Sequence, residues 1–400
     1  MDTGWQTCIS TGFAPAFTLS LGYSEYSSKS PNKKTRSLSV SINKNMRRFY
    51  RRIIFSKTPF KTQYNYRNVF QILPINSNVA PTNPYAEDFP LFLEYYIDFE
   101  EDETNVKIDI FTEVAIQQKK EFEIVNLLSV FTNHRFFKYQ TDRNSWAITT
   151  PNVGYDKLDE EVRKLYNNQY SSWILAGYMY PGLKDELEIV DFTEEKFPKT
   201  NLVSPYYHYF TDNPIEKKDG EIQFPETITD CLDSYFELSD KTNHKVKSCI
   251  YLACDGIDIA DRKRSLGFLS FISAIEGLVG LEVSDDEITF DCKSCQAIQD
   301  SPYHCPQCGK PIWGIKTKFV EFLKRFVAGS ENSARTYKEI YNLRSKITHR
   351  SQLFTGDYEL SLEEKHLNIE HTDWLMRLKT LQLFRLSLSN WLLYPQKTNS

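Results

Sequence analysis

The sequence predicts an α+β protein in which a mostly β N-terminal domain precedes an all-α helical bundle with an inserted cysteine module. Short runs of aromatic and β-branched residues recur in the first half of the chain, and helical periodicity fills the second. Two Cys-x-x-Cys pairs interrupt the helical half. We therefore expect a β-rich domain over 1–199, a linker over 200–225 and a helical domain over 226–400, with the cysteine module inserted at 288–312.

Length and composition restrict the class of protein. The 400 residues are 40% hydrophobic, 25% charged and 14% aromatic, so the chain can bury sizeable cores and is not globally disordered. The net charge of −5 excludes a chain-wide nucleic-acid-binding surface, so any RNA contact needs a local basic patch. We find no signal-peptide pattern at the N-terminus and no apolar run approaching the ~20 residues that span a bilayer. A soluble, cytoplasmic protein is expected.

The first half of the chain reads as short strands separated by turn residues. Expected strands cover 37–42, 49–55, 64–72, 91–99 and 105–114, and expected helices cover 119–132 and 156–170. These elements predict a β-sandwich or barrel-like domain with added helices.

A strongly basic segment, 29–61, lies within this region and has aromatic residues interleaved among its cations. We take Arg47, Arg48, Arg51 and Arg52 as candidate RNA-binding residues, because cations bind phosphates and neighbouring rings stack on bases. The alternative is a solvated pair of charged strands balanced by the acidic segment 98–103.

Beyond 200–225, which is polar and proline-bearing, the periodicity is helical. Expected helices cover 227–238, 241–260, 262–281, 313–326, 332–352 and 372–393. Small residues recur on one face of the third helix and favour close helix packing, namely Gly267, Ser270, Ala274 and Gly277. Glu276 is the exception on this helix, and it is either a buried counter-charge for Arg344 or a carboxylate at the edge of the apolar face.

Four of the eight cysteines lie within seventeen residues: Cys292, Cys295, Cys305 and Cys308. Two Cys-x-x-Cys knuckles this close supply four thiolates, which suit a closed tetrahedral site for structural Zn²⁺; iron is the minor alternative. His304 is a possible competing ligand. Such a site leaves no coordination position open for catalysis.

The helix expected over 332–352 carries the residues with the clearest chemical meaning. Arg344 interrupts the apolar stripe of this helix. Burying an unpaired guanidinium is costly, so Arg344 is expected to have an ion-pair partner or a functional role. His349 follows five residues later, and its ordinary pKa suits proton transfer near neutral pH. Five residues turn a helix by about 140°, so the two side chains leave different faces. Either the helix ends or bends near Thr348, or two copies of the chain combine their motifs.

Read with its flanks, the sequence from Tyr341 to His349 (YNLRSKITH) resembles the signature of HEPN domains, and more narrowly the ApeA-like branch. The resemblance covers about the last 170 residues. It implies a helical ribonuclease that dimerises to bring two Arg-x4-His motifs together, with Ser345 as the polar residue after the arginine. It further implies a toxin-like role in prokaryotic antiphage defence, with the N-terminal domain as sensor, regulator or RNA-positioning unit.

These observations predict a metal-independent endoribonuclease with RNA as the substrate and a homodimer or higher homo-oligomer as the active form. Arg344 would stabilise phosphoryl charge and His349 would move protons, supported by Glu276 and Ser345, while Lys346 and Arg350 would contact the phosphate backbone. The alternative is a non-catalytic nucleic-acid-binding or dimerisation module. In that case Arg344 is a structural ion-pair partner, and His349 is a residue favoured by the helix C-terminus.

Overall fold

The computed structural model describes most of the chain, and the following statements concern these residues only. They are 45–75, 88–100, 110–138, 160, 187, 189–212, 220–282, 290–292, 294–299, 304–309, 314–357 and 364–394. All lie in the unit Lys44–Ser400. The expected strand 37–42 falls outside them, as does the expected helix 156–170 apart from Glu160.

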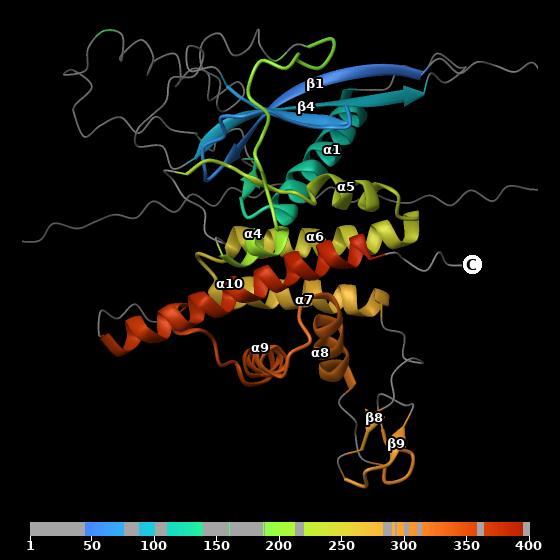
Figure 1. The fold of residues 1–400 in the computed structure, drawn as a ribbon, viewed down its shortest axis with the longest axis vertical. Coiled ribbons are helices and arrows are strands. Elements are labelled where there is room, and N and C mark those ends of the chain that lie inside the picture. Colours follow the sequence, from blue (N-terminus) through green and yellow to red (C-terminus); the bar gives the residue numbers. More distant parts are fainter. Residues whose placement is uncertain are drawn as a thin grey trace, which may run out of the picture. The chain divides into compact units, whose positions relative to one another are not determined.

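The N-terminal sheet is built on two long antiparallel strands, β1 (Asn45–Ser56) and β4 (Phe89–Glu100), which pair along their whole length (Figure 1). Their aromatic and β-branched content favours extended structure. The shorter strands β2 (Tyr64–Tyr66), β3 (Phe70–Pro74) and β5 (Phe136–Phe137) complete an antiparallel sheet of order β2-β3-β4-β1-β5. The predicted β-rich region followed by a helical region is therefore confirmed, and the structure shows that its sheet is antiparallel.

The two faces of this sheet have different partners. One face, which includes Ile54 and Leu93, packs into the same hydrophobic core as helix α1 (Ile110–Phe131). The other face carries Arg51 and Glu94 and is covered by the segment around Thr193. Strands β1 to β5 thus form one sheet between helices and a covering segment, and the described residues do not form the sandwich or barrel that we expected.

Two strand predictions were wrong in detail. The expected strand 64–72 is a hairpin, because Arg67 and Asn68 adopt left-handed φ angles of 43° and 55° and the amide of Val69 donates to the carbonyl of Tyr66 at 2.7 Å. This turn contains no glycine or proline, and its only common turn residue is Asn68, so the local signal was weak. Residues 110–114 of the expected strand 105–114 begin α1 instead.

The segment expected as a linker contains short elements. Strand β6 (Leu202–Val203) pairs in parallel with β7 (Phe224–Pro225), and helix α4 (Tyr206–Asp212) lies between them in the chain. Phe210 and Phe224 are fully buried. Burial of these two aromatic side chains therefore packs the polar, proline-bearing segment against the rest of the folded unit.

The C-terminal half of the fold is a set of packed helices that matches the predicted positions closely. They are α5 (Ile228–Phe236), α6 (Asp240–Ile259), α7 (Arg264–Glu282), α8 (Gly314–Phe326), α9 (Glu331–Arg350) and α10 (Glu364–Leu393), with a 3-10 turn, η3 (Thr355–Asp357), before α10. Apart from α10, which begins eight residues earlier than expected, these ends lie within about two residues of the predictions, which is the usual uncertainty of a helix boundary.

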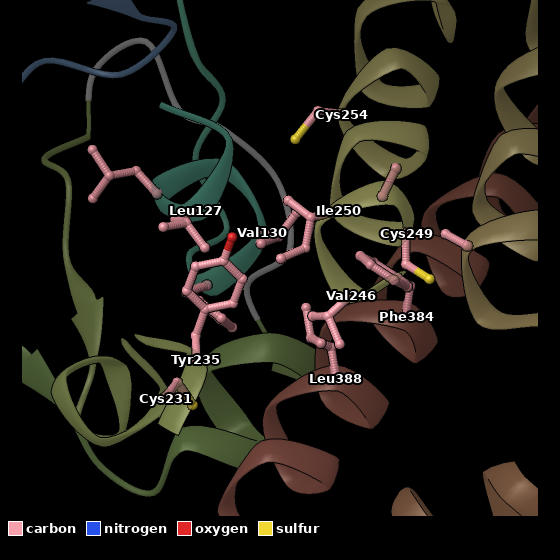
Figure 2. Packing of buried hydrophobic residues seen from close by; sticks show 14 of the residues in the cluster. Leu127, Val130, Cys231, Tyr235, Val246, Cys249, Ile250, Cys254, Phe384 and Leu388 are labelled. Carbon is pink, nitrogen blue, oxygen red and sulfur yellow. The ribbon is translucent and has the colours of Figure 1, made fainter. Parts of the chain in front are cut away.

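Side chains from several helices meet in one buried cluster. Figure 2 shows Leu127 of α1, Tyr235 of α5, Ile250 of α6 and Leu388 of α10 pointing toward one another. The same cluster contains Leu93 of the sheet. Sheet and helices therefore share a hydrophobic core, and the division into 1–199 and 226–400 stays a prediction.

Helix α7 packs closely against α6 through its small residues. A Cβ added at Gly267 would lie 2.9 Å from the carbonyl oxygen of Gly256, and one at Gly277 would collide with the thiol of Cys249. The small face that the sequence predicted is thus used for close packing. By length and composition alone α7 could cross a membrane, which corrects our expectation of no such run. Its burial against α6 and α10 is typical of a core helix.

Candidate functional site

The four-cysteine cluster occupies the chain between α7 and α8, where the sequence placed it. The short antiparallel strands β8 (Phe290–Asp291) and β9 (Ile298–Gln299) flank the first cysteine pair. The four Sγ atoms all lie within 4.8 Å of one another. Cys292 and Cys308 approach to 3.4 Å, and Cys295 and Cys305 to 3.6 Å. These separations are far longer than a disulfide bond and are close to the ~3.8 Å expected between thiolates around one tetrahedral zinc ion.

Both cysteine pairs adopt the same local turn. The residue after each pair has a left-handed backbone, with φ of 59° at Gln296 and 69° at Gly309. Its amide donates to the carbonyl of the first cysteine of its pair, at 2.6 Å for Gln296 and 2.7 Å for Gly309. Each turn thus holds its two thiols on one side. Only the second turn uses the glycine that this conformation favours.

The environment of the cluster acts differently on Cys292 and Cys295. Backbone amides of Cys295 and Ser294 donate to the thiol of Cys292 and lower its pKa to about 6. The amide of Ala297 lowers the pKa of Cys295, but desolvation and hydrogen bonds among the thiols raise it by more, to about 12. His304 is exposed and is not part of the cluster. The arrangement can therefore hold one metal ion with four sulfur ligands, and it leaves no position for a reacting molecule.

Arg344 lies on the packed side of α9 and has the partner that its position demands. Its Nη2 is 3.5 Å from Oε2 of Glu276 on α7, and the two side chains are 26% and 22% exposed. The structure thus brings together the two residues whose pairing the sequence left open. The guanidinium remains partly accessible, so a bound anion could still reach it.

Tyr341 is the third member of this group, and sequence reasoning missed it. Its hydroxyl donates to Oε1 of Glu276 at 3.1 Å, and its ring centroid is 5.7 Å from the guanidinium carbon of Arg344. Burial and the neighbouring carboxylate raise the pKa of Tyr341 to about 12. The available signal was its spacing, since a residue three positions before Arg344 shares its helix face.

His349 points away from this group. Helix α9 continues through Arg350 and ends at Ser351, whose backbone is left-handed. The helix therefore does not end or bend at Thr348, and the five-residue offset of about 140° keeps His349 off the face of Arg344. The imidazole is exposed and has no hydrogen-bond or ion-pair partner among the described residues.

The remaining candidates on α9 flank His349. Lys346 and Arg350 are exposed, and Ser345 is partly exposed between the two faces. One chain therefore has Arg344, paired with Glu276, on one side of α9. The exposed His349 lies on the other side with two exposed cations, Lys346 and Arg350.

The four arginines of β1 are matched by acceptors. Arg47 forms a bidentate pair with Asp98, at 2.8 and 3.0 Å, and Arg48 bonds Glu113 at 2.9 Å. Arg52 bonds the side chain of Gln117 at 2.5 Å. These contacts agree with the alternative of charged strands balanced by nearby carboxylates.

Arg51 is removed from the RNA-binding candidates by its burial. It is 7% exposed, and its Nε donates at 2.7 Å to Glu94, which is fully buried. A guanidinium enclosed in this way cannot reach a phosphate. For Arg47, Arg48 and Arg52, RNA binding stays a prediction that requires breaking these contacts.

Comparison of the chain with protein-family models, with curated proteins and with solved structures found no match.

Proposed function

We propose that the helical region is a metal-independent endoribonuclease in which Arg344 and His349 act on the scissile phosphate. The observation that carries this proposal is that α9 bears both a partly accessible guanidinium, positioned by Glu276, and an exposed imidazole. In the reaction a ribose 2′-OH attacks the adjacent phosphorus, and the 5′-oxygen leaves. The imidazole of His349 accepts or donates the proton, and Arg344 stabilises the charge on the phosphoryl oxygens.

The offset between the two residues supports a site made by two copies of the chain. Because they leave α9 about 140° apart, one phosphate cannot contact both side chains of a straight helix without spanning its width. In a homodimer, His349 of each copy would serve the phosphate bound near Arg344 of the other. Glu276 and Tyr341 would fix the orientation of the Arg344 guanidinium. Ser345 would lie on α9 between the face that carries Arg344 and the face that carries His349.

The test is to produce the full chain and a His349→Ala variant in a bacterial host and to compare total RNA integrity and growth. Loss of the acid–base group is expected to slow cleavage by about 10²- to 10⁴-fold without lowering the melting temperature. His244→Ala is the matched control, because His244 is an exposed histidine on α6. Cleavage that survives in His349→Ala would refute the assignment.

One observation favours a second function, a non-catalytic nucleic-acid-binding or dimerisation module. The Glu276–Arg344 pair and the Tyr341 hydrogen bond are the contacts expected of a structural arginine. Under this alternative, Arg344→Leu lowers stability and RNA remains intact in every variant. Intact RNA in wild-type cells, including cells challenged with phage, would favour the module over the nuclease.

We propose structural Zn²⁺ as the metal of the four-cysteine cluster, since four thiolates in a tetrahedral set are the usual zinc ligands of small knuckles. Metal analysis of the purified protein should give one zinc per chain, and Cys305→Ser should reduce that content. Iron in place of zinc would appear as visible absorption from iron–thiolate charge transfer. Activity in an antiphage response within the cytoplasm is part of the same proposal and rests on the family resemblance.

A further inference from the structure

Helices α8 and α9 carry a local excess of positive charge in this acidic chain. Helices α8 and α9 together contain nine Lys and Arg residues and three Glu residues, whereas the whole chain has a net charge of −5. The two helices pack directly against each other. The two helices therefore form a locally basic part of the protein, in addition to the basic segment 29–61.

On α9 the cations form a line along the exposed side. At 100° per residue, Arg335, Lys338, Lys346 and His349 fall within an arc of about 80°, and Arg350 flanks it. We call these five residues the basic stripe, and all of them are exposed. The opposite side of the helix is packed through Tyr337, Ile340 and Ile347.

The basic stripe has no ion pairs in the described part of the chain, although Glu331 and Glu339 share its side of the helix. Nearby cations do form ion pairs: Lys324 pairs with Glu321 and Arg325 with Glu282. Glu331 and Glu339, the carboxylates of α9, form no ion pair within that part of the chain either. Four Lys and Arg side chains that keep their charge in solvent form a ready surface for a polyanion.

The shape of the surface favours a linear polyanion. Arg335 and Arg350 lie fifteen residues apart, which corresponds to about 22 Å along a helix. Between them Asn342 accepts a hydrogen bond from Lys316 of α8 at 2.6 Å, which leaves its amide N–H groups as donors on the same side. Helix α9 presents no exposed large apolar side chain in the described structure. An acidic protein partner would need such an anchor, because interface energy concentrates in apolar and aromatic contacts.

We propose that the basic stripe binds the phosphate backbone of single-stranded RNA along the axis of α9 and leads the strand to His349. The choice of RNA rests on the proposed ribonuclease function. Arg335 and Lys338 lie about three to four turns from His349 and hold the strand outside the reacting position. The cleavage site would then lie at the C-terminal end of the stripe.

Binding is tested with the full chain and a fluorescein-labelled 20-nucleotide 2′-O-methyl RNA of mixed sequence. This probe lacks the attacking hydroxyl, so binding is measured without cleavage. Fluorescence anisotropy is recorded across a KCl series for wild type and for Arg335→Gln/Lys338→Gln. The matched control is Lys241→Gln/Lys245→Gln, which removes two exposed lysines of α6 that have no ion pair within the described residues.

The stripe variant should bind about tenfold more weakly, and the slope of log Kd against log[KCl] should fall by about 1.4, since each cation contributes about 0.7 for single strands. The control should match wild type, and both variants should melt as wild type does.

Equal losses in the two variants, or wild-type protein that does not bind the probe, would overturn the proposal. Displacement of the probe by polyglutamate as effectively as by unlabelled RNA would also overturn it, in favour of an acidic protein partner. Binding through the basic stripe without any RNA cleavage would refute the proposed ribonuclease activity but not the RNA-binding surface. Cleavage that depends on His349 with an unaffected Arg335→Gln/Lys338→Gln variant would refute the stripe alone.

Discussion

Two arginine-rich segments of this protein look alike in sequence and differ in structure. Strand β1 carries four arginines within six residues, and each is paired with a carboxylate or an amide. Helix α9 carries its cations along one exposed side, and the basic stripe has no ion pair among the described residues. Only the second segment keeps its charge available to a partner.

The difference follows from the neighbours that each backbone supplies. In the sheet, the antiparallel register places Arg47 opposite Asp98 and Arg51 opposite Glu94, so cross-strand pairs form directly. On α9 the solvent-facing side has no opposing strand or helix that carries a carboxylate to it in the described structure. A basic run is therefore informative about ligand binding only when the location of the nearest acids is known.

Among the substitutions proposed for β1, Arg51→Met should lower the free energy of unfolding the most. Removing this guanidinium leaves the buried carboxylate of Glu94 without its counter-charge, although Gln71 and Thr193 still donate to it. The free energy of unfolding should fall by ~3–5 kcal/mol, measured by urea denaturation. The double variant Arg51→Met/Glu94→Met should recover most of the loss.

The exposed pair serves as the matched comparison. Arg47 and Asp98 are 50% and 40% exposed, so Arg47→Gln should cost no more than ~1 kcal/mol. Equal costs for Arg47 and Arg51 would mean that burial does not separate the two sites.

A double-mutant cycle on Glu276 and Arg344 tests the intermediate case, a partly exposed pair between α7 and α9. With the two charged groups 3.5 Å apart, we expect a coupling energy of about 0.5–1 kcal/mol from Glu276→Ala, Arg344→Leu and the double variant. Thermal and urea unfolding provide the measurement. If the losses of stability in the two single variants add up to the loss in the double variant, Arg344 and Glu276 do not stabilise each other.

The smallest expected effect is a change in acid stability. A hydrogen bond from Arg47 lowers the pKa of Asp98, and hydrogen bonds from Tyr50 and then Arg48 lower the pKa of Glu113. Carboxylates with a lowered pKa contribute stability that is present above their ordinary pKa values, near 4, and is lost as the pH falls through the lowered values.

The variant Arg47→Gln/Arg48→Gln should therefore lose less stability than wild type when the pH falls from 5 to 3. Arg335→Gln/Lys338→Gln should follow wild type, because its cations have no carboxylate partner. Melting temperatures recorded at half-unit pH steps would distinguish the two variants, and identical acid profiles for all three proteins would contradict the pairing on β1.

Much of the fold was predictable because it depends on local periodicity. The apolar spacing located α5 to α9, and two Cys-x-x-Cys pairs identified the ligands of the candidate metal site without reference to the rest of the chain. The errors arose where local signals were weak. The hairpin at Arg67 and Asn68 has no glycine or proline and only Asn68 as a common turn residue. Four of residues 110–114 are β-branched or aromatic, although all five are helical.

The sequence by itself determined the order of the C-terminal helices, the cysteine cluster and the presence of Arg344 and His349 on one helix. Tertiary structure decided which charges are matched. It placed Glu276 and Tyr341 beside Arg344, enclosed Arg51 with Glu94, and left the basic stripe in solvent. Helix and strand periods act within a few residues, whereas an ion pair joins residues that are far apart in the chain, so only the packed fold reveals which cations can bind a partner.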